Sequence, residues 1–148
     1  MPRTTIVYVG AATTNASVAF KSRVGLLKQK LRDAGNAIIL EWDASSQPHL
    51  EQPLYERDIA NIRGAHIFIA VLGEPSLGLG MEIAEAMRER KAVLALYPRG
   101  DSPSRLLQSA AQSGYVELRP YGNLDDALSI ACEFIERHAQ KYRANALI

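Results

Sequence analysis

Two acidic residues, Glu82 and Asp58, stand where a carboxylate could do chemistry. Glu82 comes two residues after Gly80, so we expect it in the first turn of a helix, and the preceding residues 74–80 include a serine and two glycines. Free backbone N–H groups and the positive end of the helix dipole converge at such a turn, so the pattern predicts an anion-binding loop. A carboxylate beside such a loop could act as a nucleophile or as a base.

Each of these acids also has a purely structural interpretation. An acid in the first helical turn stabilises the helix dipole by a few tenths of a kcal/mol to about 1 kcal/mol, and Glu82 fits that description. Asp58 lies at the edge of the apolar face of a helix expected over residues 54–63, where it could simply pair with Arg57 or Arg63. In the functional interpretation the two carboxylates divide the work, since one attacks or stabilises a cationic centre and the other handles protons.

The elements that must position these acids follow from the apolar pattern. Residues 67–72 form a continuous apolar run that ends at Gly73, as expected for a strand buried on both faces of a parallel sheet. Further strands are expected at residues 6–9, 37–40, 92–97 and 115–118, and further helices at 18–34, 54–63, 104–112 and from 124 onward. In the helix at 54–63, Tyr55, Ile59 and Ile62 form the predicted buried stripe.

Strands that alternate with helices predict a three-layer α/β fold with a five-stranded parallel sheet, Rossmann-like or flavodoxin-like, and residues 1–148 are expected to form a single domain. Ligands of such sheets bind outside the carboxyl ends of the strands. Those ends carry residues 10–15, 42–52 and 73–80, which should therefore meet at one rim. Within the second of these loops, Trp42 is the candidate for contact with a base.

Composition excludes several classes of function. The 17 basic and 16 acidic side chains give a net charge near +1, so neither a nucleic acid nor an anionic membrane is expected as a partner. The single cysteine, Cys132, excludes an intrachain disulfide framework and suits a reducing cytoplasm. There is no long apolar span for a membrane helix, and the first five residues run into a strand rather than a signal-peptide core. We therefore expect a cytoplasmic protein.

Three kinds of site find no support in the sequence. His49 and His66 lack the spacing of a zinc or di-metal site, so no metal is expected. There is no Gly-x-Ser-x-Gly that would indicate a serine nucleophile. The glycine loop has neither the lysine of a Walker motif nor a complete Gly-x-Gly-x-x-Gly.

Together, these residues resemble a known family. The run YERDI at residues 55–59, an apolar strand, and PSLGLGMEIA at residues 75–84 are similar to the nucleoside 2-deoxyribosyltransferase superfamily, and closest to its 2'-deoxynucleoside 5'-monophosphate N-glycosidases. A weaker similarity around Ser109 extends the match to about residue 114. The resemblance implies that Glu82 attacks the anomeric carbon to form a glycosyl-enzyme ester. It also implies that Asp58 holds the sugar hydroxyl or Glu82 and assists protonation of the leaving base.

The resemblance also implies where a nucleotide would be bound. Ser76, Gly78 and Gly80 would face the 5'-phosphate, and Ser109 would reach that phosphate from a neighbouring subunit, because members of the family are typically homodimers or larger assemblies. It implies a small-molecule nucleotide or nucleoside as the partner, with no metal and no organic cofactor.

The first loop departs from the family pattern. The N-glycosidases have a Tyr-x-x-Gly-Ser-Ile-Arg-Gly-Gly segment after the first strand, and alignment on Gly10 places Val7 at the tyrosine. Tyr8 is one residue off, so strand alternation turns it away from the site unless a bulge intervenes, although it remains the candidate for a catalytic tyrosine. The arginine is absent. Either the substrate differs, or the hydroxyls of Thr13 and Thr14 replace the lost contacts, or activity is weak.

The function expected from this pattern is hydrolysis of the base–sugar bond of a (deoxy)nucleoside 5'-monophosphate, with Glu82 as the nucleophile and with Gly10 and Thr13 among the residues that bind the substrate. Two alternatives stay open. The first is a deoxyribosyltransferase, in which a second base rather than water resolves the intermediate. The second is a nucleotide-binding or sensory module that kept the fold and lost turnover, for which the changed first loop is the best support.

Overall fold

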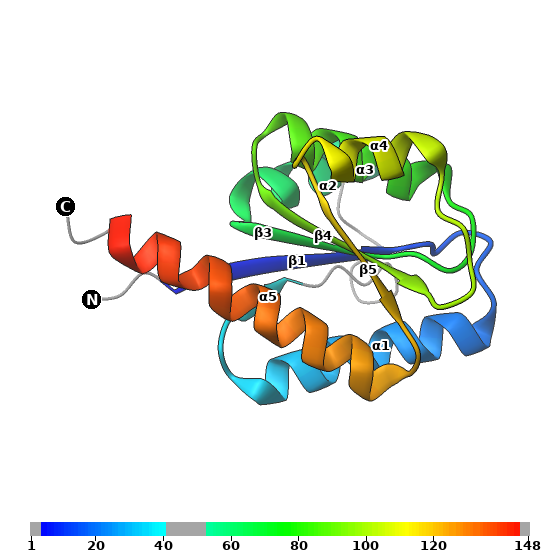
Figure 1. Cartoon of the computed structure of the whole chain (residues 1–148), viewed down its shortest axis with the longest axis horizontal. Coiled ribbons are helices and arrows are strands. Elements are labelled where there is room, and N and C mark those ends of the chain that lie inside the picture. Colours follow the sequence, from blue (N-terminus) through cyan, green and yellow to red (C-terminus); the bar gives the residue numbers. More distant parts are fainter. Residues whose placement is uncertain (1–3, 41–52, 146–148) are drawn as a thin grey trace.

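A five-stranded parallel sheet forms the centre of the computed structural model, which describes residues 4–40 and 53–145 (Figure 1). The strands are β1 (Ile6–Ala11), β2 (Ile38–Leu40), β3 (Ile67–Val71), β4 (Ala92–Pro98) and β5 (Glu117–Tyr121). The helices are α1 (Val18–Ala34), α2 (Leu54–Gly64), α3 (Leu77–Arg88), α4 (Arg105–Gln112) and α5 (Leu124–Asn145). Helices α1 and α5 cover one face of the sheet and α2, α3 and α4 the other, so the predicted three-layer α/β fold is confirmed.

The strand order is β2-β1-β3-β4-β5, and all neighbouring strands run parallel. From β1 the chain moves outward to β2 on one side, and then returns to β3 and continues to β4 and β5 on the other. The order therefore reverses between β1 and β3, and sheets of this kind bind ligands outside the strand ends at that switch point. The segments after β1 and β3 are the ones that hold the predicted site.

Strand β3 is buried along its whole length, as its continuous apolar run predicts. Phe68 and Ala70 face α2 and α3, whereas Ile67, Ile69 and Val71 pack in the other core, against α1 and α5. Because successive side chains of a strand point to opposite faces, this alternation divides the core into two layers. It also determines which side chains of β1 can meet α3.

Two details of the predicted packing are wrong. The fifth strand begins at Glu117 rather than at Tyr115, because the chain leaves α4 through a turn in which Gly114 has φ of 84° and Tyr115 remains 62% exposed. On α2 the buried stripe is narrower than expected, since Ile59 and Ile62 are buried but Tyr55 is 59% exposed.

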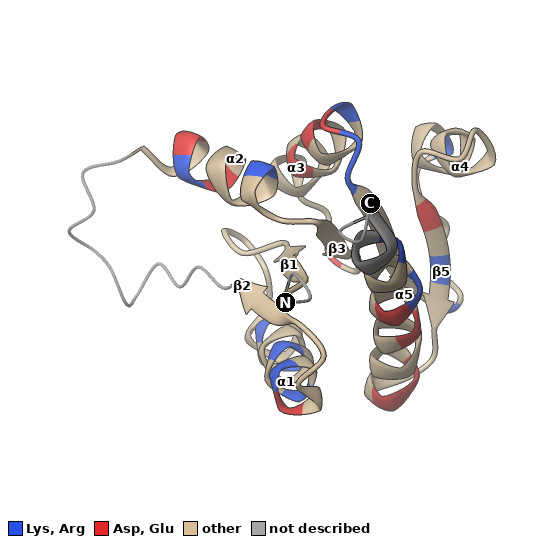
Figure 2. Ribbon diagram, turned by 90° about the vertical axis from the view of Figure 1, so that its left-hand side faces the viewer, with Lys and Arg blue, Asp and Glu red and all other residues tan. Residues whose placement is uncertain are grey.

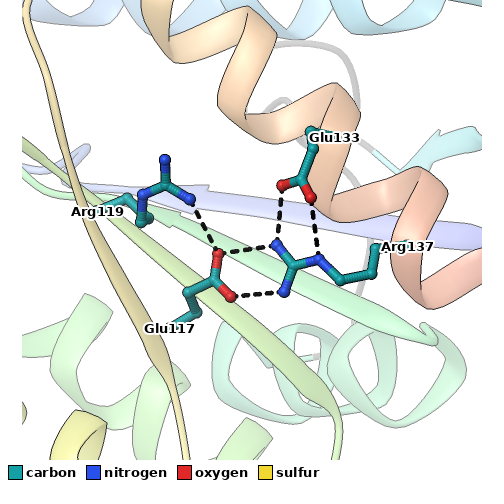
Figure 3. A network of polar contacts seen from close by, with 4 residues as sticks. All are labelled: Glu117, Arg119, Glu133 and Arg137. Atoms are coloured by element: carbon teal, nitrogen blue, oxygen red, sulfur yellow. Dashed lines mark hydrogen bonds and ion pairs between the residues drawn. The ribbon is translucent and has the colours of Figure 1, made fainter.

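A network of charged side chains attaches α5 to the edge strand β5 (Figure 3). Nη1 of Arg137 lies 2.7 Å from an oxygen of Glu117, and its Nη2 lies 2.8 Å from Glu133 one helical turn earlier. Arg119 approaches Glu117 at 3.5 Å. The network ties the closing helix to β5, the last strand of the sheet.

Charged side chains of both signs are distributed over α2 and α5 (Figure 2). Cys132, on α5, is half-buried and packs against the core, with its thiol free. In the part of the chain that the structure describes, no helix is both long and apolar enough to cross a membrane.

Candidate active site

Helix α3 starts earlier than the sequence suggested, and this changes the place of Glu82. The Ser76 hydroxyl caps the helix by accepting a hydrogen bond of 3.1 Å from the backbone N–H three residues on. Gly78 and Gly80 therefore lie inside the first turns of α3, and Glu82 is its sixth residue. The prediction of a first-turn position for Glu82 is wrong, since the first turn of α3 contains no acidic residue. The interpretation of Glu82 as a dipole-stabilising acid loses its basis with it.

Glu82 is half-buried against the sheet, and the hydroxyl of Tyr8 is hydrogen-bonded to its carboxylate. Its Oε2 atom is buried and finds no hydrogen-bond partner among the described residues. Oδ1 of Asp58, on the neighbouring helix α2, is likewise buried without a hydrogen-bond partner among the described residues. Buried carboxylate oxygens normally have partners, so two such atoms together mark a place where a ligand can supply the missing hydrogen bonds.

Tyr8 points toward the candidate site and not away from it. It is 6% exposed, belongs to the core layer of α2 and α3, and stacks on Phe68 with ring centroids 5.6 Å apart. No bulge is needed, because the register of β1 with both of its neighbours runs without interruption. Tyr8 and Gly10 are two residues apart on one strand and therefore share the face that α3 covers.

Gly10 lies on β1 close to both Phe68 of β3 and Leu79 of α3. A Cβ atom there would lie 2.9 Å from the Phe68 ring and 3.3 Å from a methyl group of Leu79. Only glycine fits without displacing these side chains. The absence of a side chain at position 10 thus lets α3 lie near enough to the sheet for the carboxylate of Glu82 to reach the tyrosine.

Burial controls the protonation of the site. It raises the pKa of Glu82 to about 7, and the charge of Asp58 acts in the same direction, while the Tyr8 hydrogen bond and the charge of Lys28 oppose the rise. Burial also raises the pKa of Asp58, against the opposing charge of Arg57. The pKa of Tyr8 is raised as well, first by burial and then by the two nearby carboxylates. A carboxyl group with a pKa near 7, as Glu82 has, can hold and release a proton near neutral pH.

The two helices that carry the carboxylates are held together by an ion-pair cluster that the sequence gave no reason to expect. The buried side chain of Glu85 on α3 lies 3.4 Å from Arg63 of α2 and 2.8 Å from Arg88. Lys91 donates a hydrogen bond of 2.8 Å to the carbonyl of Arg63 at the end of α2. Arg63 is thus engaged with α3 and not with Asp58, contrary to one of the structural interpretations above.

The remaining predicted residues lie at varying distances from this centre. Ser76 and Gly80 line a cavity of about 580 Å³ between α3 and α4, which contains none of Glu82, Tyr8 and Asp58. Thr13 is exposed in the segment between β1 and α1.

Two further predicted residues are not brought to the centre within the described chain. Ser109 is exposed on α4 and does not line the cavity. Trp42 falls outside the residues that the structure describes. In the described ranges, 4–40 and 53–145, no group of three or more His, Cys, Asp or Glu side chains could hold a metal ion.

Known proteins share sequence with this chain. A protein of Thermofilum pendens named as a 2'-deoxynucleoside 5'-phosphate N-hydrolase is 29% identical over 114 residues, which cover 72% of this chain and 79% of the relative. The 5-hydroxymethyl-dUMP N-hydrolase of Mus musculus is 32% identical over 73 residues, covering 48% of this chain and 42% of the mouse enzyme. No protein-family model matches the chain.

Solved structures share its fold. The CMP N-glycosidase BcmB of Clostridium botulinum superposes with a TM-score of 0.62 at 20% identity, over 85% of this chain and 97% of that one. A 2-deoxyribosyltransferase of Bacillus psychrosaccharolyticus gives a TM-score of 0.61 at 16% identity, over 83% of this chain and 90% of that one. The resemblance to the nucleoside 2-deoxyribosyltransferase superfamily is confirmed. Both sequence relatives are named as N-hydrolases, which agrees with the class of enzyme expected from the sequence.

Proposed function

We propose that the protein hydrolyses the base–sugar bond of a (deoxy)nucleoside 5'-monophosphate, with Glu82 as the nucleophile. The observation that carries this proposal is the half-buried Glu82 carboxylate, which is bonded by Tyr8 on one side and has its Oε2 atom without a partner among the described residues. Asp58, whose charge acts on Glu82, has a second buried oxygen without a partner among the described residues. Two carboxylates of this kind are what a retaining glycosidase uses.

In the proposed reaction, an oxygen of ionised Glu82 attacks the anomeric carbon while the bond to the base breaks. The electron pair of that bond goes to the base, which takes up a proton from the carboxyl group of Asp58, and the sugar remains as an ester of Glu82. Water then attacks the same carbon, the Asp58 carboxylate takes up the proton that this water releases, and the Glu82 carboxylate leaves. The Tyr8 hydroxyl orients the carboxylate throughout, and the partner-free oxygen of Asp58 is available to a sugar hydroxyl.

The 5'-phosphate is proposed to bind at the start of α3. The first backbone N–H groups of a helix have no partner within the helix, and the dipole favours an anion there. Gly78 and Gly80 leave that end uncovered, since a Cβ at Gly80 would meet nothing within 4 Å. Ser76 caps the same turn, and Thr13 comes from the β1–α1 loop. Trp42 stays the proposed contact for the base.

A deoxyribosyltransferase is the closest rival, and it differs only in that a base resolves the ester. The missing arginine of the first loop favours it, because that loop then offers less positive charge to a phosphate. A nucleotide-binding module without turnover is the remaining alternative, and the same loop favours it.

One assay separates the three functions. The protein is incubated with a panel of ribo- and deoxynucleoside 5'-monophosphates and free nucleosides, with and without an acceptor base, and released and transferred bases are quantified. Release of base without acceptor, abolished in Glu82→Ala and retained in the exposed-residue control Glu136→Gln, is the expected result. Base exchange only with an acceptor would favour the transferase. Binding of a nucleotide without release of base from any substrate would contradict the proposed activity.

We propose further that the enzyme works as a homodimer in the cytoplasm, and that Ser109 of one subunit reaches the phosphate site of the other. Helix α4 buries none of its residues, Leu106 on it is 83% exposed, and the largely apolar cavity between α3 and α4 lies beside it. A second copy is the simplest cover for this surface.

Light scattering of the wild type is expected to give twice the mass of one chain. The Leu106→Asp variant is expected to give a lower mass. Mixing inactive Glu82→Ala with inactive Ser109→Ala subunits should restore part of the activity if Ser109 acts across the interface. A monomeric wild type with full activity would contradict this arrangement.

A further inference from the structure

Glu74, in the turn between β3 and α3, has no part in the reaction above, yet its carboxylate reaches a different loop. Its Oε2 atom accepts a hydrogen bond of 2.7 Å from the backbone N–H of Ser17, the N-cap residue of α1. The two residues are 57 positions apart in the sequence. The contact therefore joins the β1–α1 loop to the β3–α3 turn, the two segments at the switch point of the sheet.

A second contact, between Phe20 and Gly73, joins the same two segments. Phe20, in the first turn of α1, is 2% exposed. A Cβ atom at Gly73 would lie 2.6 Å from its ring, so only glycine fits at that position. The start of α1 is thus seated on the backbone directly before Glu74. The buried Phe20 ring packs against Gly73, and the Glu74 carboxylate bonds the N-cap of α1 at the surface.

Thr13 is connected to this contact through the backbone. The N–H of Ala16 donates a hydrogen bond of 3.4 Å to the carbonyl of Thr13, so the loop turns immediately before Ser17. Two residues beyond Glu74, Ser76 caps α3. Glu74 therefore bridges the loop that carries Thr13 and the turn that leads into α3.

Hydrogen bonds from the hydroxyl and the amide of Ser17 hold the pKa of Glu74 below its usual range, and the charges of Arg23 and Lys21 act in the same direction. The carboxylate is therefore ionised at neutral pH. A hydrogen bond to an ionised acceptor is stronger than one between neutral groups.

We propose that Glu74 is a positioning residue for substrate binding, which holds the β1–α1 loop with Thr13 at the fixed distance from the Ser76 turn that a nucleotide needs. This inference rests on the proposed function of that rim. It gives a reason why a first loop without the arginine can still have one defined position: the loop is held by an anion of the protein itself, supplied from the β3–α3 turn.

Two variants separate the hydrogen bond from the fold. Glu74→Gln keeps an acceptor oxygen for the Ser17 amide, and Glu74→Ala removes it. We expect Glu74→Ala to raise KM for the nucleotide about tenfold, the weight of one charge-assisted hydrogen bond, with kcat within about twofold of wild type. Glu82 and Tyr8 lie on other elements, so kcat should not follow. Glu74→Gln should recover part of the loss, because it keeps the acceptor oxygen but not the charge, and the urea midpoint of both variants should stay near that of wild type.

The outcomes that overturn the proposal are specific. They are an unchanged KM in Glu74→Ala, a fall in kcat as large as the rise in KM, and a Glu74→Gln variant as impaired as Glu74→Ala.

Variants at Ser17 test the same contact from the other side. Ser17 has φ of −64°, which proline adopts, so Ser17→Pro removes the amide donor without changing the backbone angle. Ser17→Ala is the matched control, because it loses the hydroxyl and keeps the amide. We expect Ser17→Pro to raise KM more than Ser17→Ala does, and the double variant with Glu74→Ala to be no worse than Ser17→Pro. Additive losses in the double variant would show that the two residues act independently and would overturn the proposal.

A measurement without turnover keeps this inference separate from the proposed function. The exchange of the Ser17 amide proton, followed by NMR without substrate, should be slow in wild type and in Glu74→Gln and at least about tenfold faster in Glu74→Ala. Calorimetric binding of nucleoside 5'-monophosphates should weaken in parallel. If wild type releases no base, the proposed activity fails while these two readouts still decide the role of Glu74. Equal exchange rates in wild type and Glu74→Ala would overturn it.

Discussion

The raised pKa of Glu82 makes a prediction about stability that needs no substrate. Folding raises this pKa from 4.5 to about 7, chiefly through burial. A carboxyl group whose pKa is raised by folding favours the native state while it is protonated, and this contribution is lost as the pH rises through the folded pKa. A rise of about 2.5 pKa units corresponds to at most about 3 kcal/mol of unfolding free energy.

Glu82→Gln removes the titrating group and keeps its size. We expect the variant to match wild type in unfolding free energy below about pH 4.5, and to become progressively more stable than wild type up to about pH 7, by at most about 3 kcal/mol. The free energy is measured by urea denaturation at closely spaced pH values, with circular dichroism as the probe.

The control is Glu136→Gln on α5, whose side chain is exposed. Its free-energy curve should run parallel to that of wild type across this range. A difference between wild type and Glu82→Gln that stays constant from about pH 5 to pH 8 would refute the burial argument, and with it the physical reason for placing a proton at this carboxylate.

Three other substitutions test single contacts. Tyr8→Phe removes a hydrogen bond that lowers the pKa of Glu82, so the acid limb of the pH profile of kcat/KM should move to higher pH; a limb that stays in place would contradict the contact. Hydrogen bonds from Arg137 of α5 lower the pKa of Glu117, which is partly exposed. At neutral pH the unfolding free energy of wild type should therefore exceed that of Glu117→Gln by at most about 1 kcal/mol. In urea denaturation curves this difference should vanish as the pH falls below about 4.5. Gly10→Ala forces a methyl group against the Phe68 ring of β3 and should lower the unfolding free energy by about 1–3 kcal/mol, measured by thermal or urea unfolding. Gly25→Ala, with nothing within 4 Å of the new Cβ, should not destabilise the protein. Equal stabilities of the two variants would contradict the close approach at Gly10.

Much of the candidate site could be predicted because its residues lie within or directly beside strands and helices with a clear local pattern. The apolar run before Gly73 predicts a buried strand, and the serine and glycines after it predict a helix start, so Glu82 was placed near a strand end on local evidence alone. The alternation of strands and helices likewise predicted the parallel sheet. These features depend on periodicity and turn chemistry, which act over a few residues.

The errors have local causes as well. Residues 74–80 were expected to form a loop with Glu82 in the first helical turn after it, but the helix capped by Ser76 begins at Leu77, which places Glu82 in its second turn. The fifth strand was expected to begin at Tyr115, but it begins at Glu117, and the turn at Gly114 leaves the Tyr115 ring exposed. In both cases local backbone geometry, which the apolar pattern does not specify, set the boundary of the element.

By itself, the sequence determined the fold class, the rim at which ligands should bind and the two carboxylates worth testing, because each follows from patterns within one element. Only the tertiary structure decided that Tyr8 faces Glu82, that Asp58 and Glu82 both leave an oxygen without a partner among the described residues, and that Glu74 bonds Ser17 across the rim. The reason is physical: a strand's alternation tells which side chains share a face, but which face meets α3 depends on how the helices pack on the finished sheet.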